Sequence, residues 1–278
     1  MSSRSMSFKA KINSYAKKNL IPAQVVLQNV MFERFLERLS RSEYRENFVI
    51  KGGILVSVLV GIDTRTTMDL DTTLRRLELT EEKIMDAITN ICAIDLQDDI
   101  FFRINSIDLI RKDDAYGGFR VKLDAIYEQI ITPLSIDIST GDVITPKAVE
   151  YEISGIMDDS VRINLWGYSV ETVLAEKAES ILSRGLTNTR HRDYYGVFIL
   201  VKKLDYDSDI FLEALEATAK HRGSWLRIKD YEPITTQIEN SEVLREIWDK
   251  YRKAFRYANG ISFDDTVGAL RKLLLMDR

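Results

Sequence analysis

The sequence has 278 residues, of which 45% are hydrophobic and 29% are charged, so it can form one large or two ordinary globular domains with a buried core. The net charge of −4 provides no overall basic field, and a nucleic-acid substrate would therefore need a local basic patch. One cysteine and two histidines exclude an intramolecular disulfide and leave catalysis to carboxylates, lysines and arginines. Since the N-terminus lacks the apolar core of a signal peptide and no apolar run could span a bilayer, we expect a cytoplasmic protein with no membrane contact.

Up to about residue 165, the sequence predicts helices around a mostly antiparallel sheet. The elements in chain order are a helix over 22–41, a strand over 48–51, an apolar segment over 54–60, a strand over 68–74, a helix capped by Thr80, strands over 101–110 and 119–127, and a strand over 134–139. Tyr116-Gly117-Gly118 joins the two long strands, which favours a hairpin.

Beyond about residue 165, the pattern changes to helices. They are expected over 169–184, 190–204, 208–221, 241–255 and 263–276, and Ser262 with Asp265 fits a capping box for the last one. We therefore expect an α+β protein with a sheet-containing domain over 1–165 and a helical domain over 166–278.

Two aspartates lie close together, at Asp69 and Asp71. Residues two apart on a strand point to the same face, so these carboxylates would repel each other unless something compensates. A divalent cation is the natural compensation, because Mg²⁺ takes hard oxygen ligands from one or two carboxylates together with nucleotide phosphates. A pair of acids on a solvated strand face is the alternative interpretation of so short a pattern.

A glycine pair, Gly52 and Gly53, directly follows the apolar strand over 48–51. Glycine lets backbone N–H groups approach a phosphate closely, and the next segment could supply a helix N-terminus. A plain strand-to-helix turn would use the same residues. The order of strand, glycine pair, helix and aspartate-bearing strand is more specific than any of its parts.

That order resembles the first motif of the AbiEii/AbiGii toxin family of nucleotidyltransferases, from type IV toxin–antitoxin and abortive-infection systems. The matching stretches are Val49-Ile50-Lys51-Gly52-Gly53 and Arg65-Thr66-Thr67-Met68-Asp69-Leu70-Asp71. The resemblance implies a nucleotidyltransferase-like mixed, largely antiparallel sheet flanked by helices. It also implies that Gly52 and Gly53 face the triphosphate, that Thr67 lies beside it, and that Asp69 and Asp71 hold Mg²⁺.

A third carboxylate is expected on a neighbouring strand in this family, and Asp137 fits best. Over 134–139 apolar side chains alternate with polar ones, which places Asp137 on a polar face with Ser135 and Ser139. The resemblance would make Asp137 a metal ligand or the base that activates an attacking hydroxyl. Asp124 is a rival because it also occupies a polar strand face, and a solvent-facing acid is the simpler interpretation.

In the helical part, a lysine and an aspartate fall on apolar faces. Lys177 lies three residues after Leu174 and four before Ile181, and Asp193 lines up with Val197. A lysine in such a position extends its charged end to solvent or meets an anion. The two residues could therefore pair as a structural salt bridge.

The resemblance gives these residues a sharper role. The stretches Leu174-Ala175-Glu176-Lys177-Ala178 and Arg190-His191-Arg192-Asp193-Tyr194-Tyr195 resemble later motifs of the AbiEii family. This implies that Lys177 and Arg190 bind the triphosphate and that Asp193 acts at the active site, with Arg184 as a further candidate. Gly196 stands where the family often has a second aspartate, so no second acid is expected on this helix.

The function predicted from these residues is Mg²⁺-dependent transfer of a nucleoside monophosphate from an NTP to an acceptor, with the helical domain completing the active site. The resemblance implies that the acceptor is RNA, such as the end of a tRNA, and that the protein is a toxin countered by a cognate antitoxin protein. Two alternatives are a non-catalytic module that binds NTP or RNA, and a glycosyltransferase whose two aspartates bind a nucleotide sugar.

Overall fold

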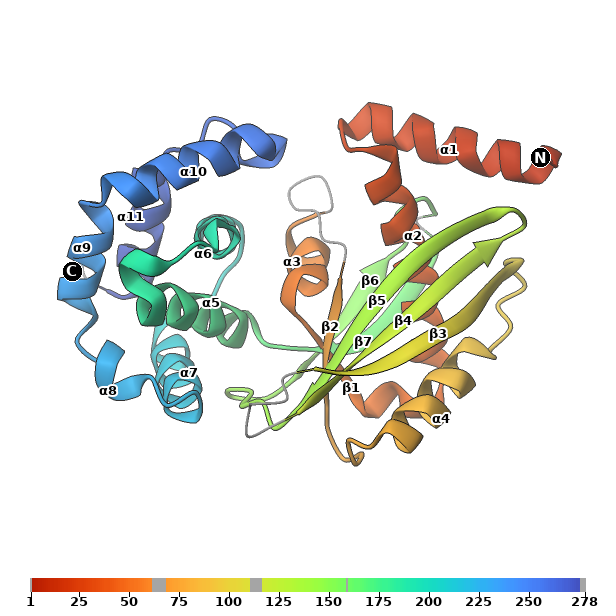
Figure 1. Cartoon of the computed structure of the whole chain (residues 1–278), viewed down its shortest axis with the longest axis horizontal. Coiled ribbons are helices and arrows are strands. Elements are labelled where there is room, and N and C mark those ends of the chain that lie inside the picture. The colour runs from red at the N-terminus through yellow and green to blue at the C-terminus, as the bar shows by residue number, and fades with distance from the viewer. Residues whose placement is uncertain (1, 62–68, 111–116, 159, 276–278) are drawn as a thin grey trace. The chain divides into compact units, whose positions relative to one another are not determined.

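A computed structural model describes residues 2–61, 69–110, 117–158 and 160–275 of the chain (Figure 1). Its internal contacts divide into two compact units, one made of Met1–Gly141 with Val149–Gly167 and the other of Asp142–Ala148 with Tyr168–Arg278. The boundary expected near residue 165 lies close to the last of these divisions. That the two units are separate domains stays a prediction.

The first unit contains one seven-stranded sheet in the order β3-β4-β5-β2-β1-β7-β6. Only two pairings, β1 with β7 and β2 with β5, are parallel; the other four are antiparallel. This confirms the expected α+β class with a largely antiparallel sheet. The strands are β1 (Phe48–Lys51), β2 (Leu70–Leu74), β3 (Ile100–Ile110), β4 (Gly118–Tyr127), β5 (Ile130–Thr140), β6 (Val149–Ser154) and β7 (Arg162–Gly167).

Four helices belong to the described part of this unit, and they are α1 (Ser3–Asn19), α2 (Ala23–Arg41), α3 (Gly52–Val60) and α4 (Glu81–Cys92). Helix α2 packs against β5 and β7, and α3 packs against β1 and β2. The alternation along β4 explains this layering, because Val121, Leu123 and Ala125 are buried on the helix-covered face. The intervening residues, among them Arg120 and Asp124, point to the opposite face.

The helices of the second unit are α5 (Val170–Arg184), α6 (His191–Lys203), α7 (Ser208–His221), α8 (Trp225–Ile228), α9 (Tyr231–Glu239), α10 (Glu242–Ala254) and α11 (Phe263–Leu273). The capping box of Ser262 and Asp265 is present at α11, as the sequence predicted. None of the helices in the described ranges is long and apolar enough to cross a lipid bilayer.

The start of helix α5 is hydrogen-bonded to residues 142–148, the short segment between β5 and β6 that belongs to the second unit. The hydroxyls of Ser169 and Thr172 donate to the carbonyl of Thr145 over 2.8 and 2.7 Å, and the Thr145 amide donates back to the Thr172 hydroxyl over 3.0 Å. Tyr168 donates to the Asp142 carboxylate over 2.9 Å. Residues 142–148 therefore hold the start of α5 in place by hydrogen bonds.

The structure corrects several element boundaries. The hairpin predicted from the two long strands is present as β3 and β4, but α1, β6, β7, α8 and α9 were not predicted. The strand expected over 68–74 is described as a strand only from Leu70. Asp69 precedes the strand, and Met68 lies outside the described residues.

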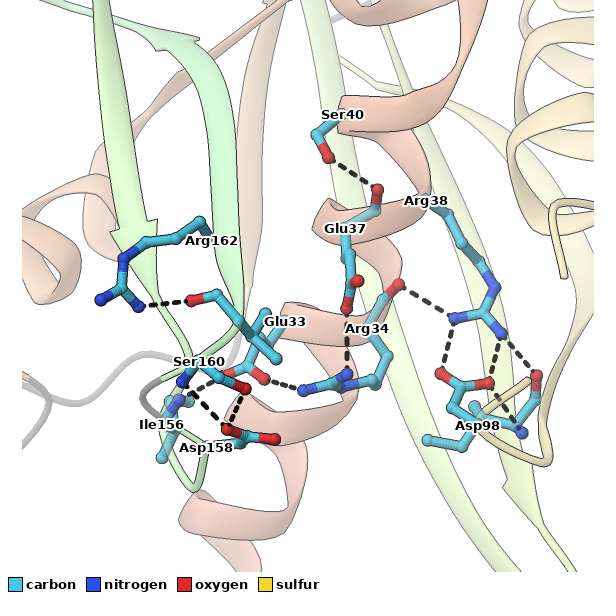
Figure 2. Close-up of polar contacts among 12 residues, drawn as sticks. Glu33, Arg34, Glu37, Arg38, Ser40, Asp98, Ile156, Asp158, Ser160 and Arg162 are labelled. Atoms are coloured by element: carbon cyan, nitrogen blue, oxygen red, sulfur yellow. Dashed lines mark hydrogen bonds and ion pairs between the residues drawn. The ribbon is translucent and has the colours of Figure 1, made fainter. Parts of the chain in front are cut away.

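A buried arginine ties α2 to the start of β3 (Figure 2). Arg38 has a side chain only 2% exposed, and it donates to both carboxylate oxygens of Asp98, over 3.0 and 2.8 Å, and to the Ile100 carbonyl over 2.8 Å. On the other side of α2, Glu33 accepts from Arg34 and from the Ile156 amide between β6 and β7. Burial raises the pKa of the Glu33 carboxyl despite these donors. Helix α2 thus contacts both ends of the strand order.

We predict that Asp98→Asn lowers the free energy of unfolding by about 3–5 kcal/mol, because it leaves the Arg38 charge buried without a counter-charge. Asp99→Asn is the matched control, since Asp99 pairs with Arg4 at the surface, where both side chains are more than half exposed, and such pairs contribute less than about 1 kcal/mol. Urea unfolding of both variants measures the difference. Equal losses in the two variants would show that the buried pair does not anchor α2.

Candidate active site

Charged side chains from five neighbouring strands form one row across the sheet. Lys51 lies opposite Asp71, Asp71 beside Asp137, Asp137 opposite Arg120, and Arg120 opposite Asp108. Residues aligned in this way on adjacent strands project from the same face of a sheet. We call these five residues the charged row. It lies on the face opposite helix α2.

The end of the row at β1 is buried. Lys51 is only 6% exposed, and its Nζ donates to the Ser139 hydroxyl over 2.8 Å. The Ser139 hydroxyl donates in turn to the Thr72 carbonyl over 3.3 Å. Lys51 therefore places a fixed positive charge beside Asp71, although the sequence analysis gave it no role.

Gly52 carries the closest approach between the glycine pair and the aspartates. Its φ is +64°, a conformation that L side chains rarely adopt, and a Cβ added here would overlap the Asp71 carboxylate and lie 2.8 Å from its Cγ. Gly52 and Gly53 open helix α3, whose N-cap Lys51 forms no side-chain cap. The first turn of α3 thus begins next to the Asp71 carboxylate, and the backbone N–H groups of a helix's first turn suit a phosphate.

The two metal-binding candidates differ in their setting. Asp71 is half-buried on β2, whereas Asp69 is exposed and directly precedes the strand. Of the two aspartates, only Asp71 therefore lies on a strand, and the alternation of side chains along a strand does not apply to Asp69. Thr67, the predicted phosphate neighbour, lies outside the described residues.

The register separates the two candidates for the third carboxylate. Asp137 lies beside Asp71, and both its oxygens accept from Arg120, over 2.7 Å from Nε and 2.7 Å from Nη2. Asp124 lies opposite Pro133 and pairs with Arg103 over 2.6 Å, outside the charged row. Arg103 lowers the pKa of Asp124. The geometry favours Asp137.

The donor chemistry of this region fits a divalent cation bound together with a nucleotide. Within the described residues, no group of three or more acids, histidines or cysteines is arranged to hold a metal by itself. Asp69 and Asp71 supply hard carboxylate oxygens, and Mg²⁺ usually completes its shell with substrate phosphates and water. Helix α3 begins at Gly52, close to the Asp71 carboxylate, so a phosphate bound at its first turn would lie near these acids.

The second unit contains the predicted lysine and aspartate in direct contact. Lys177 on α5 and Asp193 on α6 have side chains 9% and 12% exposed, and Nζ lies 3.6 Å from Oδ1. Ser180 donates to the other Asp193 oxygen over 3.2 Å. The salt bridge considered in the sequence analysis is therefore present. It brings both residues of the later motif together.

Arginines gather at the start of α6. Arg190 immediately precedes the helix, and partial desolvation of its guanidinium, followed by the positive charge of Arg184, lowers the pKa of that group. Arg192 and Arg222 lower it further. Arg222 is tied to Glu176 and Glu179 over 2.7 Å each, but Arg184, Arg190 and Arg192 are exposed. These three form a local basic patch on an acidic protein.

The predicted residues thus fall into two groups, one per unit. Gly52, Gly53, Asp69, Asp71 and Asp137 belong to the first unit, whereas Lys177, Arg190 and Asp193 belong to the second. No role was predicted from the sequence for Lys51, Arg120 or Ser139. Arg120 could have been found by counting across the two-residue turn between β4 and β5, because Tyr127 pairs with Ile130 and each step outward then aligns Arg120 with Asp137.

Comparison with known proteins places this fold. A search of curated proteins returned no match. The structure is similar to JHP933 from Helicobacter pylori, at 15% identity over 91% of both chains with a TM-score of 0.54. It is also similar to a candidate nucleotidyltransferase from H. pylori, at 16% identity over 91% of this chain and 94% of that chain with a TM-score of 0.50. Identities this low show the fold alone.

The amino-acid sequence also matches a known protein family. The family model described as "Nucleotidyl transferase AbiEii toxin, Type IV TA system" matches residues 34–269. This region runs from within α2 to within α11 and contains every residue discussed above as a site candidate. The chain therefore belongs to the AbiEii family of nucleotidyltransferase toxins of type IV toxin–antitoxin systems.

Proposed function

We propose that this toxin transfers a nucleoside monophosphate from an NTP to an RNA acceptor in an Mg²⁺-dependent reaction. The observation that supports the proposal is the close approach of Gly52 to the Asp71 carboxylate, because a phosphate bound at the first turn of α3 would then lie next to an acid able to hold Mg²⁺. The reaction would take place in the cytoplasm, where NTPs and RNA are available. A cognate antitoxin protein would counter it.

Each residue group has a task that follows from its chemistry. The first-turn N–H groups of α3, at Gly52 and Gly53, would bind phosphate oxygens. Asp69 and Asp71 would hold Mg²⁺, with Asp137 as the third acid. When bound, Mg²⁺ neutralises phosphate charge and polarises the phosphoryl group that is attacked. Nucleotidyl transfer depends mainly on such positioning and charge compensation.

The second unit would supply positive charge. Lys177 and Arg190 would offset the charge of the β and γ phosphates, and Asp193 would orient Lys177 through their ion pair. Arg184 and Arg192 would extend this positive charge towards an RNA backbone. The end of a tRNA is the acceptor that we favour, because it presents a free hydroxyl next to a phosphate chain.

The first prediction concerns the metal-binding acids. Incubating the protein with labelled NTPs, Mg²⁺ and total RNA should label RNA, and Asp69→Asn or Asp71→Asn should reduce labelling at least about a hundredfold. Without Mg²⁺, the Asp69→Asn variant should melt at or above the wild-type temperature, because a charge that repels Asp71 has been removed. Asp124→Asn is the matched control and should retain labelling, since Asp124 pairs with Arg103 outside the charged row.

Two results would contradict this assignment. Full labelling by the Asp71→Asn variant would remove that residue from the metal site. Retention of NTP by the wild type with no label in RNA would instead indicate a binding module without turnover.

The second prediction separates the two roles of Lys177. If it contacts the triphosphate, Lys177→Met should weaken binding of a non-hydrolysable NTP analogue roughly ten- to a hundredfold, or about 1.5–3 kcal/mol. Asp193→Asn should weaken it less than Lys177→Met does, because the lysine charge remains although the ion pair that orients it is lost. Calorimetric titration measures both. Unchanged affinity in both variants, with both melting temperatures lowered, would make the pair purely structural.

The third prediction concerns Gly52. Gly52→Ala should lower the free energy of unfolding by at least about 1–2 kcal/mol because of the left-handed backbone, and should displace Asp71 and weaken NTP binding. Gly268→Ala in α11 is the control, because a Cβ there meets no atom within 4 Å and alanine favours a helix by about 1 kcal/mol. Thermal unfolding compares them. A Gly52→Ala variant as stable as wild type would contradict the close approach.

A further inference from the structure

The third carboxylate of the proposed site is turned towards the strand on its other side. The register places Asp137 on β5 next to Asp71 on β2. Both Asp137 oxygens nevertheless accept hydrogen bonds from Arg120 on β4, which is the opposite neighbour of β5 in the sheet. Asp137 therefore forms these hydrogen bonds on the side away from Asp69 and Asp71, with which it would hold a cation.

Arg120 acts as the common counter-charge of the acidic group. Its hydrogen bonds with Asp137, and then the charges of Asp137, Asp69 and Asp71, raise the pKa of the guanidinium. A guanidinium is planar and matches both oxygens of a carboxylate, which a point charge cannot do. In the protein without metal, Arg120, together with Lys51 beside Asp71, thus compensates the repulsion that a divalent cation would otherwise compensate.

The Arg120 side chain is exposed enough to exchange one partner for another. It is 43% exposed, whereas the Asp137 side chain is 18% exposed. Asp108, opposite Arg120 on β3, offers an alternative acid, and its own partner Lys122 lies 2.9 Å away at an exposed position. A change of partner by Arg120 would therefore need no change in the buried core.

We infer that Arg120 is a positioning residue that holds Asp137 on the β4 side, and that a divalent cation bound by Asp69 and Asp71 competes with Arg120 for Asp137. This inference rests on the proposed function, because it concerns the same acids. It adds that metal loading includes the exchange of one cationic partner of Asp137 for another.

The test is the affinity of the full chain for Mn²⁺ alone, measured by electron paramagnetic resonance of free Mn²⁺ and by calorimetry, without NTP. Arg120→Gln should bind Mn²⁺ about tenfold more tightly than wild type. Arg120→Lys should also bind more tightly, by a few fold, because lysine keeps the charge but cannot hold both oxygens. Arg103→Gln is the matched control, since Arg103 pairs with Asp124 on the same face and should leave the affinity unchanged.

The double variant Arg120→Gln with Asp137→Asn decides whether the effect passes through Asp137. In that variant the gain over the single Asp137→Asn variant should vanish. If Arg120→Lys binds Mn²⁺ like wild type and Arg120→Gln keeps its full gain without Asp137, then Arg120 acts only by its charge and the inference is overturned. Unchanged affinity in all Arg120 variants would overturn it as well.

These outcomes are distinct from a failure of the proposed function. If the wild type binds Mn²⁺ and loses it on Asp69→Asn or Asp71→Asn, the metal site stands whatever the Arg120 variants show. If neither wild type nor Arg120→Gln binds Mn²⁺ at millimolar concentration, the metal assignment and the inference fail together.

Discussion

The register between β1, β2, β5 and β4 is the constraint on which the proposed site depends. Because side chains alternate between faces, a slip of one residue in any of these pairings would move Asp71, Asp137 or Arg120 to the helix-covered face. The register is fixed at several points. Gly52 ends β1 directly after Lys51, and a two-residue turn joins β4 to β5. Asp71 and Asp137 are therefore positioned by paired backbone, which is more rigid than a loop.

The same register is reinforced by the packing on the other face. Val121, Leu123 and Ala125 on β4, and Leu134, Ile136 and Ile138 on β5, are nearly inaccessible to solvent. Any slip would expose these side chains and bury charges, and both changes oppose it. The contacts of α2 with the start of β3 and with the segment before β7 hold the helix across this surface. Core packing and site geometry thus depend on one alignment of the strands.

The sequence predicted the local elements well and the long-range ones poorly. Helices α5, α6, α7, α10 and α11 were predicted within a few residues because apolar spacing and capping residues are local signals. The parallel pairing of β2 with β5 joins residues more than sixty positions apart, and no local pattern encodes it. The strands β6 and β7 were missed although β6 alternates Val149, Tyr151 and Ile153 with polar residues, because each strand is only six residues long.

The candidate site residues divide in the same way, into those marked by local sequence and those that depend on strand pairing. The family motifs led directly to Gly52, Asp71, Lys177 and Asp193, because these residues are contiguous with recognisable stretches of sequence. Arg120 carries no motif, and its relation to Asp137 exists only once the two strands are paired. Lys51 lay inside the quoted motif, but its burial and its bond to Ser139 follow from tertiary structure.

The anchoring of α5 on Thr145 has a consequence for how this protein can be divided or recombined. The chain crosses between the two units three times, after Gly141, after Ala148 and after Gly167. A fragment that begins at Tyr168 would contain α5 but would lack the carbonyl that receives Ser169 and Thr172. The helical unit is thus discontinuous in the gene, and a graft onto another sheet would have to carry two separate stretches of sequence.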